Sequence, residues 1–191
     1  MNNIGIIGAM SEEISLIKSV MSIEKTFEKA GYTFFSGKLG NKDIVLVLCG
    51  IGKVNAAVCT QLLIDTFSVE AVINTGVAGA VADGVTIGDV VISTDAQHHD
   101  MHCSPFGDPV GIIPRMDNSI FKADDTLIKA AVNASEKIIK GKTITGRVVS
   151  GDQVIADSET KNRLKTLFNG SCAEMEGAAI GHVCYLNKIP F

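Results

Sequence analysis

Two glutamates separated by a single residue, Glu174 and Glu176, carry the most suggestive chemistry in the sequence, because charged side chains there lie between two apolar runs. Small residues follow from Gly177 onward, and small residues let a backbone approach a neighbour or a ligand closely. If the backbone is still extended here, both carboxylates point to the same side. Two interpretations stay open: a solvated turn whose Glu residues favour the next helix N-terminus, or a ligand cleft at the carboxyl ends of parallel strands.

A third carboxylate, Glu13, follows another predicted strand. Ile4–Ile7 is an apolar run typical of a buried strand, and Ser11 is expected to be the N-cap of the helix that comes next. Glu13 then falls in the first turn, where spacing alone favours a surface acid that complements the helix dipole. The small residues of Gly76–Gly79 also come directly after a predicted strand. These three segments are predicted to meet in one cleft, because the carboxyl ends of strands converge in a doubly wound sheet.

A polar cluster, Gln97–Cys103, contains residue types that bind zinc: His98, His99, Asp100 and His102. A structural zinc site usually needs four ligands at recurring spacings and from two places in the chain. A single crowded cluster is therefore interpreted as a polar loop rather than as a metal site. Another polar signal, Gly50–Lys53, opens a predicted helix and could hold an anion, but it lacks the P-loop spacing, so a tight turn is favoured.

The composition is that of an ordinary globular chain. The 191 residues are 46% hydrophobic and 20% charged, with 17 basic and 21 acidic side chains and a net charge of −4. Scattered basic residues and only 5% aromatics argue against nucleic-acid binding. No run approaches the ~20 apolar residues that would span a bilayer, and no signal peptide is recognised. Five cysteines without close pairing are interpreted as reduced thiols of a cytoplasmic protein.

Alternation of strands and helices predicts the architecture. Strands are expected at Ile4–Ile7, Tyr32–Leu39, Asp43–Cys49, Ala71–Asn74, Ile87–Ile92, Thr143–Ser150 and Cys172–Ala173, and helices after Ser11 and over Val54–Thr66, Asp124–Ile139, Lys161–Phe168 and a segment reaching about Tyr185. Near-continuous apolar strands indicate an α/β sandwich on a largely parallel sheet, in one domain over residues 1–191. The Pro-rich segment from Ser104 to Ser119 is predicted to be a long, functional loop.

Six segments, taken together, resemble one family. They are IGIIGAMSEEI (4–14), GIGKVNAA (50–57), NTGVAGA (74–80), FKADD (121–125), SGDQVI (150–155) and AEMEGAAIGHVC (173–184). In this order they resemble the 5′-methylthioadenosine/S-adenosylhomocysteine nucleosidases of the purine nucleoside phosphorylase/hydrolase superfamily. The resemblance implies a three-layer α/β/α sandwich around a twisted, mostly parallel mixed sheet. It also implies a homodimer that uses no metal or organic cofactor and releases adenine from 5′-thio-substituted adenine nucleosides.

The resemblance also assigns site residues. Glu13 looks like the base that activates water, Met175 and Glu176 like ribose contacts, and the Ile155 backbone like the contact to the adenine edge. Val154 replaces what is often a stacking aromatic, and Val77 stands where some members have Ser. Ala78 and Gly79 resemble the lining of the sugar and base region, and Glu174 is counted among the substrate-binding residues. Positions around the 5′-thio group are resembled by Ala9, Met10, Ile51, Cys103, Phe106 and Pro114. Pro114 and its loop are expected to reach the partner's pocket.

One part of the family pattern lies beyond the residues given. The general acid of the family is an Asp in a segment resembling R-x-x-S-D, after the I-P-F that ends this sequence at Phe191. The last strand and C-terminal helix are then missing, and weak or no hydrolysis is expected from 191 residues alone. Alternatives are a catalytically dead nucleoside-binding protein, a phosphorylase, and a related hydrolase acting on another nucleoside such as futalosine.

Overall fold

The computed structural model describes residues 1–191 and contains two five-stranded sheets with helices against their faces. The first sheet has the order β2-β3-β4-β1-β5, and the second has the order β6-β10-β9-β7-β8. The strands are β1 (Asn3–Gly8), β2 (Ser22–Lys29), β3 (Tyr32–Leu39), β4 (Lys42–Leu48), β5 (Ala71–Asn74), β6 (Gly79–Ala80), β7 (Val90–His98), β8 (Ile120–Lys122), β9 (Thr143–Ser150) and β10 (Gly170–Glu174). The helices are α1 (Ser11–Val20), α2 (Lys53–Phe67), α3 (Asp125–Ile138), α4 (Ser158–Phe168) and α5 (Gly177–Asn187), with a 3₁₀ turn η1 (Ser104–Phe106).

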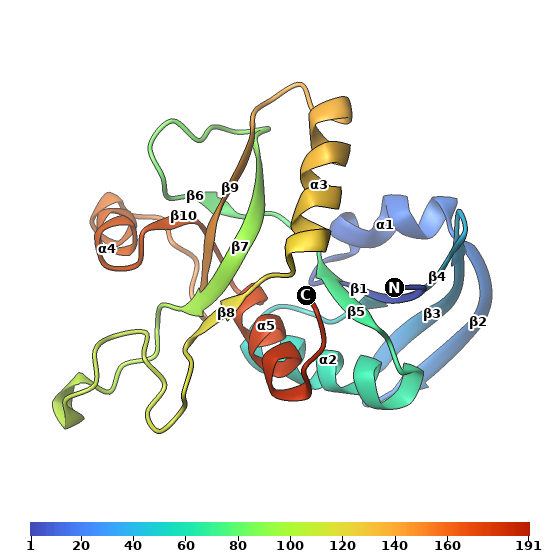
Figure 1. Ribbon diagram of the computed structural model, residues 1–191, viewed down its shortest axis with the longest axis horizontal. Coiled ribbons are helices and arrows are strands. Elements are labelled where there is room, and N and C mark those ends of the chain that lie inside the picture. The colour runs from blue at the N-terminus through green and yellow to red at the C-terminus, as the bar shows by residue number, and fades with distance from the viewer.

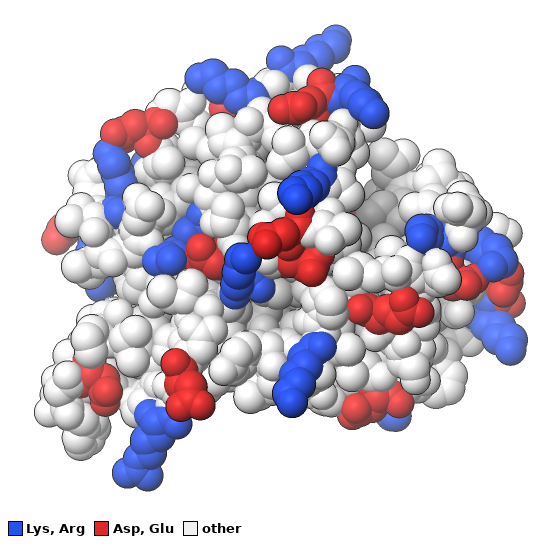
Figure 2. Space-filling view, viewed as in Figure 1, with Lys and Arg blue, Asp and Glu red and all other residues white.

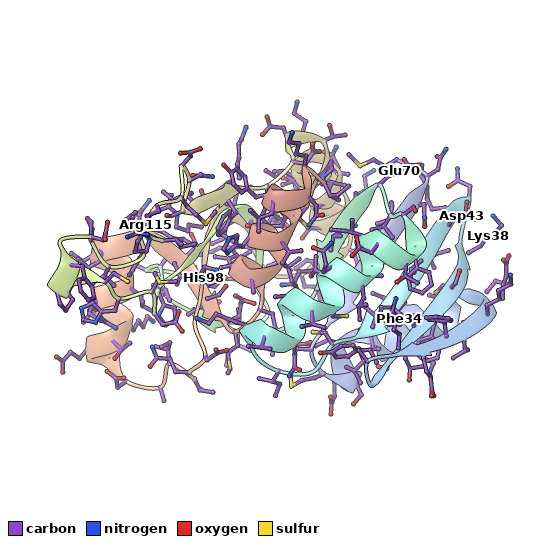
Figure 3. The ribbon with its side chains drawn as sticks, turned by 90° about the horizontal axis from the view of Figure 1, so that it is seen from below. Phe34, Lys38, Asp43, Glu70, His98 and Arg115 are labelled. Atoms are coloured by element: carbon purple, nitrogen blue, oxygen red, sulfur yellow. The ribbon has the colours of Figure 1, made fainter.

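The central strands β1 and β4 of the first sheet are buried on both faces, which explains their continuous apolar runs. Side chains alternate along a strand, so Ile6 of β1 packs with α1 while Ile7 packs on the opposite face with α2 and α5. In β4, Leu46 and Val47 divide in the same way. Phe34 of β3 is completely buried in the larger cluster (Figure 3). Helix, sheet and helix therefore form three layers.

Helix α5 connects the two sheets. It packs against α2 and β5 on one side and against β7, β8 and β9 on the other, and Figure 1 shows it between the sheets. Each sheet has parallel pairs at its centre, β1 with β4 and β5, and β9 with β7 and β10. The pairs β2–β3 and β3–β4 of the first sheet and β6–β10 and β7–β8 of the second are antiparallel, whereas the edge strand β5 is parallel to β1. The layered α/β class and the mixed sheet are confirmed.

Several local predictions were wrong. The strand β2 was not predicted, because its sequence SIEKTFEK is polar and every residue of this edge strand is exposed. The strand expected at Ile87–Ile92 begins only at Val90. Helix α1 begins at Ser11, so the N-cap is Met10 instead. Gln97 and His98 belong to β7 and are buried, so the polar loop begins later than expected.

The surface carries charges of both signs. Figure 2 shows acidic and basic side chains interspersed over the face in view. An example is the exposed pair Lys38–Asp43 on β3 and β4, whose atoms Nζ and Oδ1 lie 2.6 Å apart (Figure 3). Among the helices, none has the length and apolar character needed to cross a membrane.

At the last residues of the chain, backbone carbonyls accept two hydrogen bonds. Pro190 O accepts from Val72 N of β5 at 2.9 Å, and Phe191 O accepts from Asp124 N at 2.8 Å. The Phe191 ring lies against Gly181 of α5, where an added Cβ would be 2.7 Å from it. The segment after α5 thus runs beside β5, in the space between the two sheets (Figure 1).

Candidate functional site

The Glu13 carboxylate is held by three backbone N–H groups from two segments. Oε2 accepts from Ala9 N at 2.7 Å and Met10 N at 2.9 Å, and Oε1 accepts from Val77 N at 3.0 Å. Its place in the first turn of α1 lets it reach back to the N-cap, as in a capping box. The third bond comes from the loop after β5, so Glu13 is fixed between the ends of two neighbouring strands rather than lying free on the surface.

Gly76 is required by this arrangement. A Cβ added there would lie 2.7 Å from Glu13 Oε1. The small residues after β5 therefore make room for a carboxylate of the protein itself, which the sequence reasoning had interpreted only as room for a ligand. Ala78 is exposed beside them, and Gly79 begins β6.

Glu176 lies at the N-cap of α5, and its side chain is 9% exposed. Its Oε1 accepts from Gly52 N at 2.6 Å. Gly52 has φ +101°, a conformation that favours glycine. The Gly50–Lys53 segment, interpreted from sequence as a tight turn, therefore does hold an anion, and that anion is the Glu176 carboxylate. Met175 is half-buried beside it.

Glu174 is positioned differently from Glu176, because the extended backbone on which a shared direction of the two side chains depended ends at Glu174. Glu174 is the last residue of β10, whereas the backbone of Glu176 is no longer extended. Glu174 Oε2 accepts from Glu176 N at 2.9 Å and Gly177 N at 2.7 Å, and Oε1 accepts from the hydroxyl of Ser150. Its carboxylate is therefore occupied by the N-terminus of α5.

The three carboxylates repel one another in a partly dehydrated setting. Burial raises the pKa of Glu174, opposed by its hydrogen bonds from Ser150 and the helix. Burial also raises the pKa of Glu176, opposed by Gly52 N–H and reinforced by the charges of Glu174 and Glu13. Burial and the same carboxylates raise the pKa of the Cys49 thiol to about 12, so this cysteine stays protonated. The three carboxylates form an acidic cluster near the carboxyl ends of β1, β4 and β10.

A small cavity of about 100 Å³ lies beside β10. Gly79, Ile155 and Ala173 contribute to its lining, so two of the predicted base-binding positions meet there. Val154 is 80% exposed and does not belong to the lining. The cavity is partly apolar and has Ile155 in its lining, which suits a heteroaromatic group.

The residues predicted for a 5′-thio pocket fall into two groups. Ala9 and Met10 contact Glu13 directly, and Ile51 precedes the Gly52 N–H that holds Glu176. Cys103, Phe106 and Pro114 belong instead to the long loop around η1, which projects away from the body (Figure 1). Phe106 is 89% exposed. In Figure 1 the part of the loop that contains η1 lies away from both sheets.

The histidine cluster does not converge. His98 packs its ring against Phe121 and His182, His99 lies against Gly151, and His102 Nε2 lies 2.5 Å from Ser104 Oγ. No group of three or more His, Cys, Asp or Glu side chains is arranged to hold a metal ion. The histidines also do not edge the Glu13 cleft as a loop, because two of them are buried at the end of β7.

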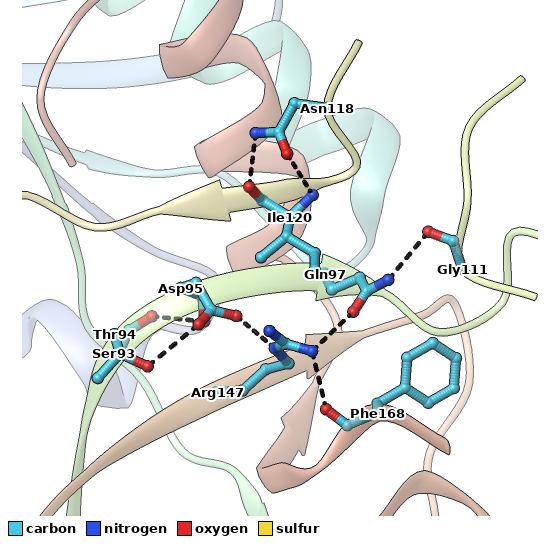
Figure 4. Close-up of polar contacts among 9 residues, drawn as sticks. All are labelled: Ser93, Thr94, Asp95, Gln97, Gly111, Asn118, Ile120, Arg147 and Phe168. Atoms are coloured by element: carbon cyan, nitrogen blue, oxygen red, sulfur yellow. Dashed lines mark hydrogen bonds and ion pairs between the residues drawn. The ribbon is translucent and has the colours of Figure 1, made fainter. Parts of the chain in front are cut away.

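A larger polar hollow, about 300 Å³, lies elsewhere on the second sheet, between β7, β9 and the end of α4. Figure 4 shows the polar contacts behind it: Arg147 bonds to Asp95, Gln97 and the carbonyl of Phe168. The other cation of the hollow, Lys165, pairs with a carboxylate as well. Because both cations are already paired, this hollow joins strands to helix and offers no free charge.

Comparison with known proteins places the whole sequence in one group. The family model of the phosphorylase superfamily matches residues 3–191. A protein of Staphylococcus carnosus named 5′-methylthioadenosine/S-adenosylhomocysteine nucleosidase is 44% identical over 190 residues, which cover 98% of this chain and 82% of that protein.

Solved structures agree. A nucleosidase of the same name from Neisseria meningitidis, in complex with methylthio-immucillin-A, superposes with a TM-score of 0.95 at 38% identity, covering 100% of this chain and 83% of that chain. The futalosine hydrolase of Helicobacter pylori superposes with a TM-score of 0.92 at 32% identity, covering 99% of this chain and 81% of that chain.

Proposed function

The chain belongs to the phosphorylase superfamily and, within it, to the 5′-methylthioadenosine/S-adenosylhomocysteine nucleosidases, and we propose that it hydrolyses the N-glycosidic bond of these two adenine nucleosides. The products are adenine and the corresponding thioribose. The observation that carries this assignment is that Glu13 and Glu176, from opposite ends of the chain, accept hydrogen bonds from the segments that follow the neighbouring strands β1 and β4.

Glu13 is proposed as the base that activates the attacking water. Hydrolysis builds positive charge on the ribose ring, as in other glycoside hydrolyses, and water must lose a proton as it adds. A carboxylate has about four acceptor positions, and three of those of Glu13 are filled by backbone N–H groups. The remaining position, on Oε1, is enough for one water molecule at a fixed point.

Glu176 is proposed to bind the ribose hydroxyls, with Met175 packing against the sugar. Glu176 accepts one hydrogen bond from the protein, from Gly52 N, so acceptor positions remain for two hydroxyl groups. Charge-assisted bonds of this kind are stronger than neutral ones and would fix the sugar. We place adenine in the small cavity, with its edge on the Ile155 backbone and Val77, Ala78 and Gly79 near the base and sugar.

Water is favoured over phosphate as the nucleophile. The charges that act on the Glu176 carboxylate come from Glu174 and Glu13, and both raise its pKa. The basic side chain nearest in sequence to the Gly52 contact, Lys53, is paired with Asp100 through both carboxylate oxygens. A phosphate dianion entering this cleft would be repelled, which argues against a phosphorylase.

A homodimer is proposed as well, because the remaining 5′-pocket positions, Cys103, Phe106 and Pro114, lie on a loop that projects away from the chain's own cleft. In a dimer this loop could close the partner's pocket with apolar side chains suited to a thioether. A cytoplasmic location is proposed because all five cysteines are free thiols, as expected in a reducing compartment.

The test is adenine release from methylthioadenosine, followed by ultraviolet absorbance. It should be run with the 191-residue chain and with a form extended through the R-x-x-S-D segment, where the resemblance places the acid that protonates adenine. Glu13→Gln should lower the release rate by about 10²–10⁴-fold, the usual contribution of a general base. The matched control is Glu12→Gln, which alters the exposed neighbour of Glu13 in the same helical turn.

Release by either form that is lost in Glu13→Gln and retained in Glu12→Gln supports the proposal. Equal rates for Glu13→Gln and the unmodified protein would remove Glu13 from the mechanism. Tight methylthioadenosine binding without release by either form would favour a nucleoside-binding protein, and preference for futalosine would favour the related hydrolase.

A further inference from the structure

The two sheets are not joined by strand pairing, so other contacts must hold them in place relative to each other. One polar cluster crosses this boundary close to the proposed ribose site. Lys53, at the start of α2, comes from the first half of the chain, whereas Asp100 follows β7 and Asp152 follows β9 in the second sheet. The three residues form what is called here the Lys53 clamp.

The clamp is closed by four hydrogen bonds. Lys53 Nζ donates to Asp100 Oδ1 and Oδ2, both at 2.7 Å, and the two side chains are only 22% and 21% exposed. Asp152 N donates to Asp100 Oδ2 at 3.0 Å, and Asp152 Oδ1 accepts from Lys53 N at 2.8 Å. Lys53 is therefore held both by its side chain and by its backbone, a stronger fixation than that of an exposed ion pair.

The residue held in this way is adjacent to the one that positions Glu176. Gly52 N donates to Glu176 Oε1 at 2.6 Å, and the backbone of Gly52 adopts φ +101°. A Cβ added to Gly52 would lie 3.1 Å from Asp152 Oδ1, so the carboxylate of the clamp also packs against this glycine. Moving the Lys53 backbone would turn the Gly52 N–H away from Glu176.

We propose that the Lys53 clamp positions Glu176 for the ribose hydroxyls, by fixing the Gly52 N–H between the two sheets. Lys53, Asp100 and Asp152 are positioning residues in this account, because their polar groups bond to one another. The inference rests on the proposed function and extends it: the affinity for the sugar depends on an ion pair that spans the cleft. Adenine alone does not need Glu176, so its binding is independent of the clamp.

The experiment measures binding by calorimetry in a Glu13→Gln background, which prevents turnover. The probes are methylthioadenosine and free adenine. Lys53→Met removes the ion pair with little loss of side-chain length, and Asp100→Asn removes it from the other side while keeping the shape. Lys53→Arg keeps the pair and serves as the rescue. The matched control is Lys38→Met, which breaks the exposed Lys38–Asp43 pair on β3 and β4.

Lys53→Met and Asp100→Asn are expected to weaken methylthioadenosine binding by about 10-fold to 100-fold, the range for a lost charge-assisted hydrogen bond, and adenine binding by less than about 2-fold. Lys53→Arg and Lys38→Met should bind both ligands as the background does. In a Glu176→Gln protein, Lys53→Met should add less than about 2-fold, because the clamp acts through Glu176.

The role of the clamp would be overturned if Lys53→Met weakened the binding of adenine and of methylthioadenosine equally. It would also be overturned if the effects of Lys53→Met and Glu176→Gln on methylthioadenosine binding were additive. Either result would leave the proposed function standing. Failure of the Glu13→Gln background to bind methylthioadenosine at all would overturn the proposed function, and the role of the clamp with it. If Lys53→Met does not fold, the same readings from the isosteric Asp100→Asn decide the question.

Discussion

Protonation of the buried His98 is expected to make the protein less stable in mildly acidic solution. His98 is 6% exposed, and its Nδ1 has no hydrogen-bond partner. The ring faces Phe121 at 6.0 Å and His182 at 5.7 Å between centroids. Burial lowers the pKa of His98 to about 4, with help from the charges of Lys53 and His182 and opposition from Asp100 and Asp152.

The difference in proton binding between the folded and unfolded chains sets the direction and size of this effect on the free energy of unfolding. The pKa of His98 is about 4 in the folded protein against 6.5 ordinarily, so between these values the unfolded chain binds more protons. Stability from His98 is present in full above about pH 6.5 and is lost as the pH falls towards 4. The complete loss is about 3 kcal/mol at 1.36 kcal/mol per pKa unit, and about 2 kcal/mol of it falls between about pH 7 and pH 5.

The assay is urea unfolding at several pH values for the unmodified chain, His98→Gln and the control His102→Gln. His102 is an exposed histidine of the same segment, so its replacement controls for the loss of a histidine as such. Burial also lowers the pKa of His99 and His182 and raises that of Glu174, so only the difference between His98→Gln and the unmodified chain isolates His98. If the free energy of unfolding fell with pH equally steeply in these two proteins, or more steeply in His98→Gln, His98 would not be the cause of the acid instability.

Two further measurements address the helix N-terminus and the assembly. Ser150→Ala should lower the free energy of unfolding, measured with urea, by about 1–3 kcal/mol. Ser150 is fully buried, and its Oγ donates to Glu174 and accepts from Ala178 N at 2.7 Å. A loss no larger than that caused by Ser15→Ala, at an exposed serine, would contradict this. Light scattering should give twice the mass of one chain, and Phe106→Ser should shift it towards one; a single-chain mass for the unmodified protein would rule out the homodimer.

Much of the fold could be predicted because burial on both faces leaves a strong pattern. The apolar runs of β1, β4 and β5 alternate with helices whose starts and ends carry ordinary signals, such as Asp124 accepting from Thr126 N and Leu127 N. Edge strand β2 carries no such pattern, because all of its residues are exposed and many are charged. Its extended backbone is held by hydrogen bonds to β3 instead. Its one aromatic contact, Phe27 on Phe67, comes from a helix far along the chain.

The meeting of the acidic segments could be predicted from the sequence, but the hydrogen bonds of each carboxylate could not. The carboxylates and glycines at strand ends indicated that these segments meet at the carboxyl ends of the strands. Hydrogen bonds from Ala9, Met10 and Val77 to Glu13 do join two of the predicted segments. The clamp was missed because Lys53, Asp100 and Asp152 are separated along the chain and carry no spacing signature. A signal did exist for the Gly52 contact, since a glycine-rich loop at a helix start was recognised as able to hold an anion.

The roles proposed for the three neighbouring carboxylates follow from how many hydrogen bonds each already accepts from the protein. Glu174 receives two N–H groups and a hydroxyl and is turned towards α5, so it has little capacity for a ligand. Glu13 receives three N–H groups, which leaves a single acceptor position for a water. Glu176 receives only Gly52 N–H and keeps room for a pair of hydroxyl groups. The spacing of Glu174 and Glu176 in the sequence does not distinguish their environments, but the structure does. Strand β10 ends at Glu174, whose side chain binds the N-terminus of α5, whereas the side chain of Glu176 reaches Gly52 after the first sheet's β4.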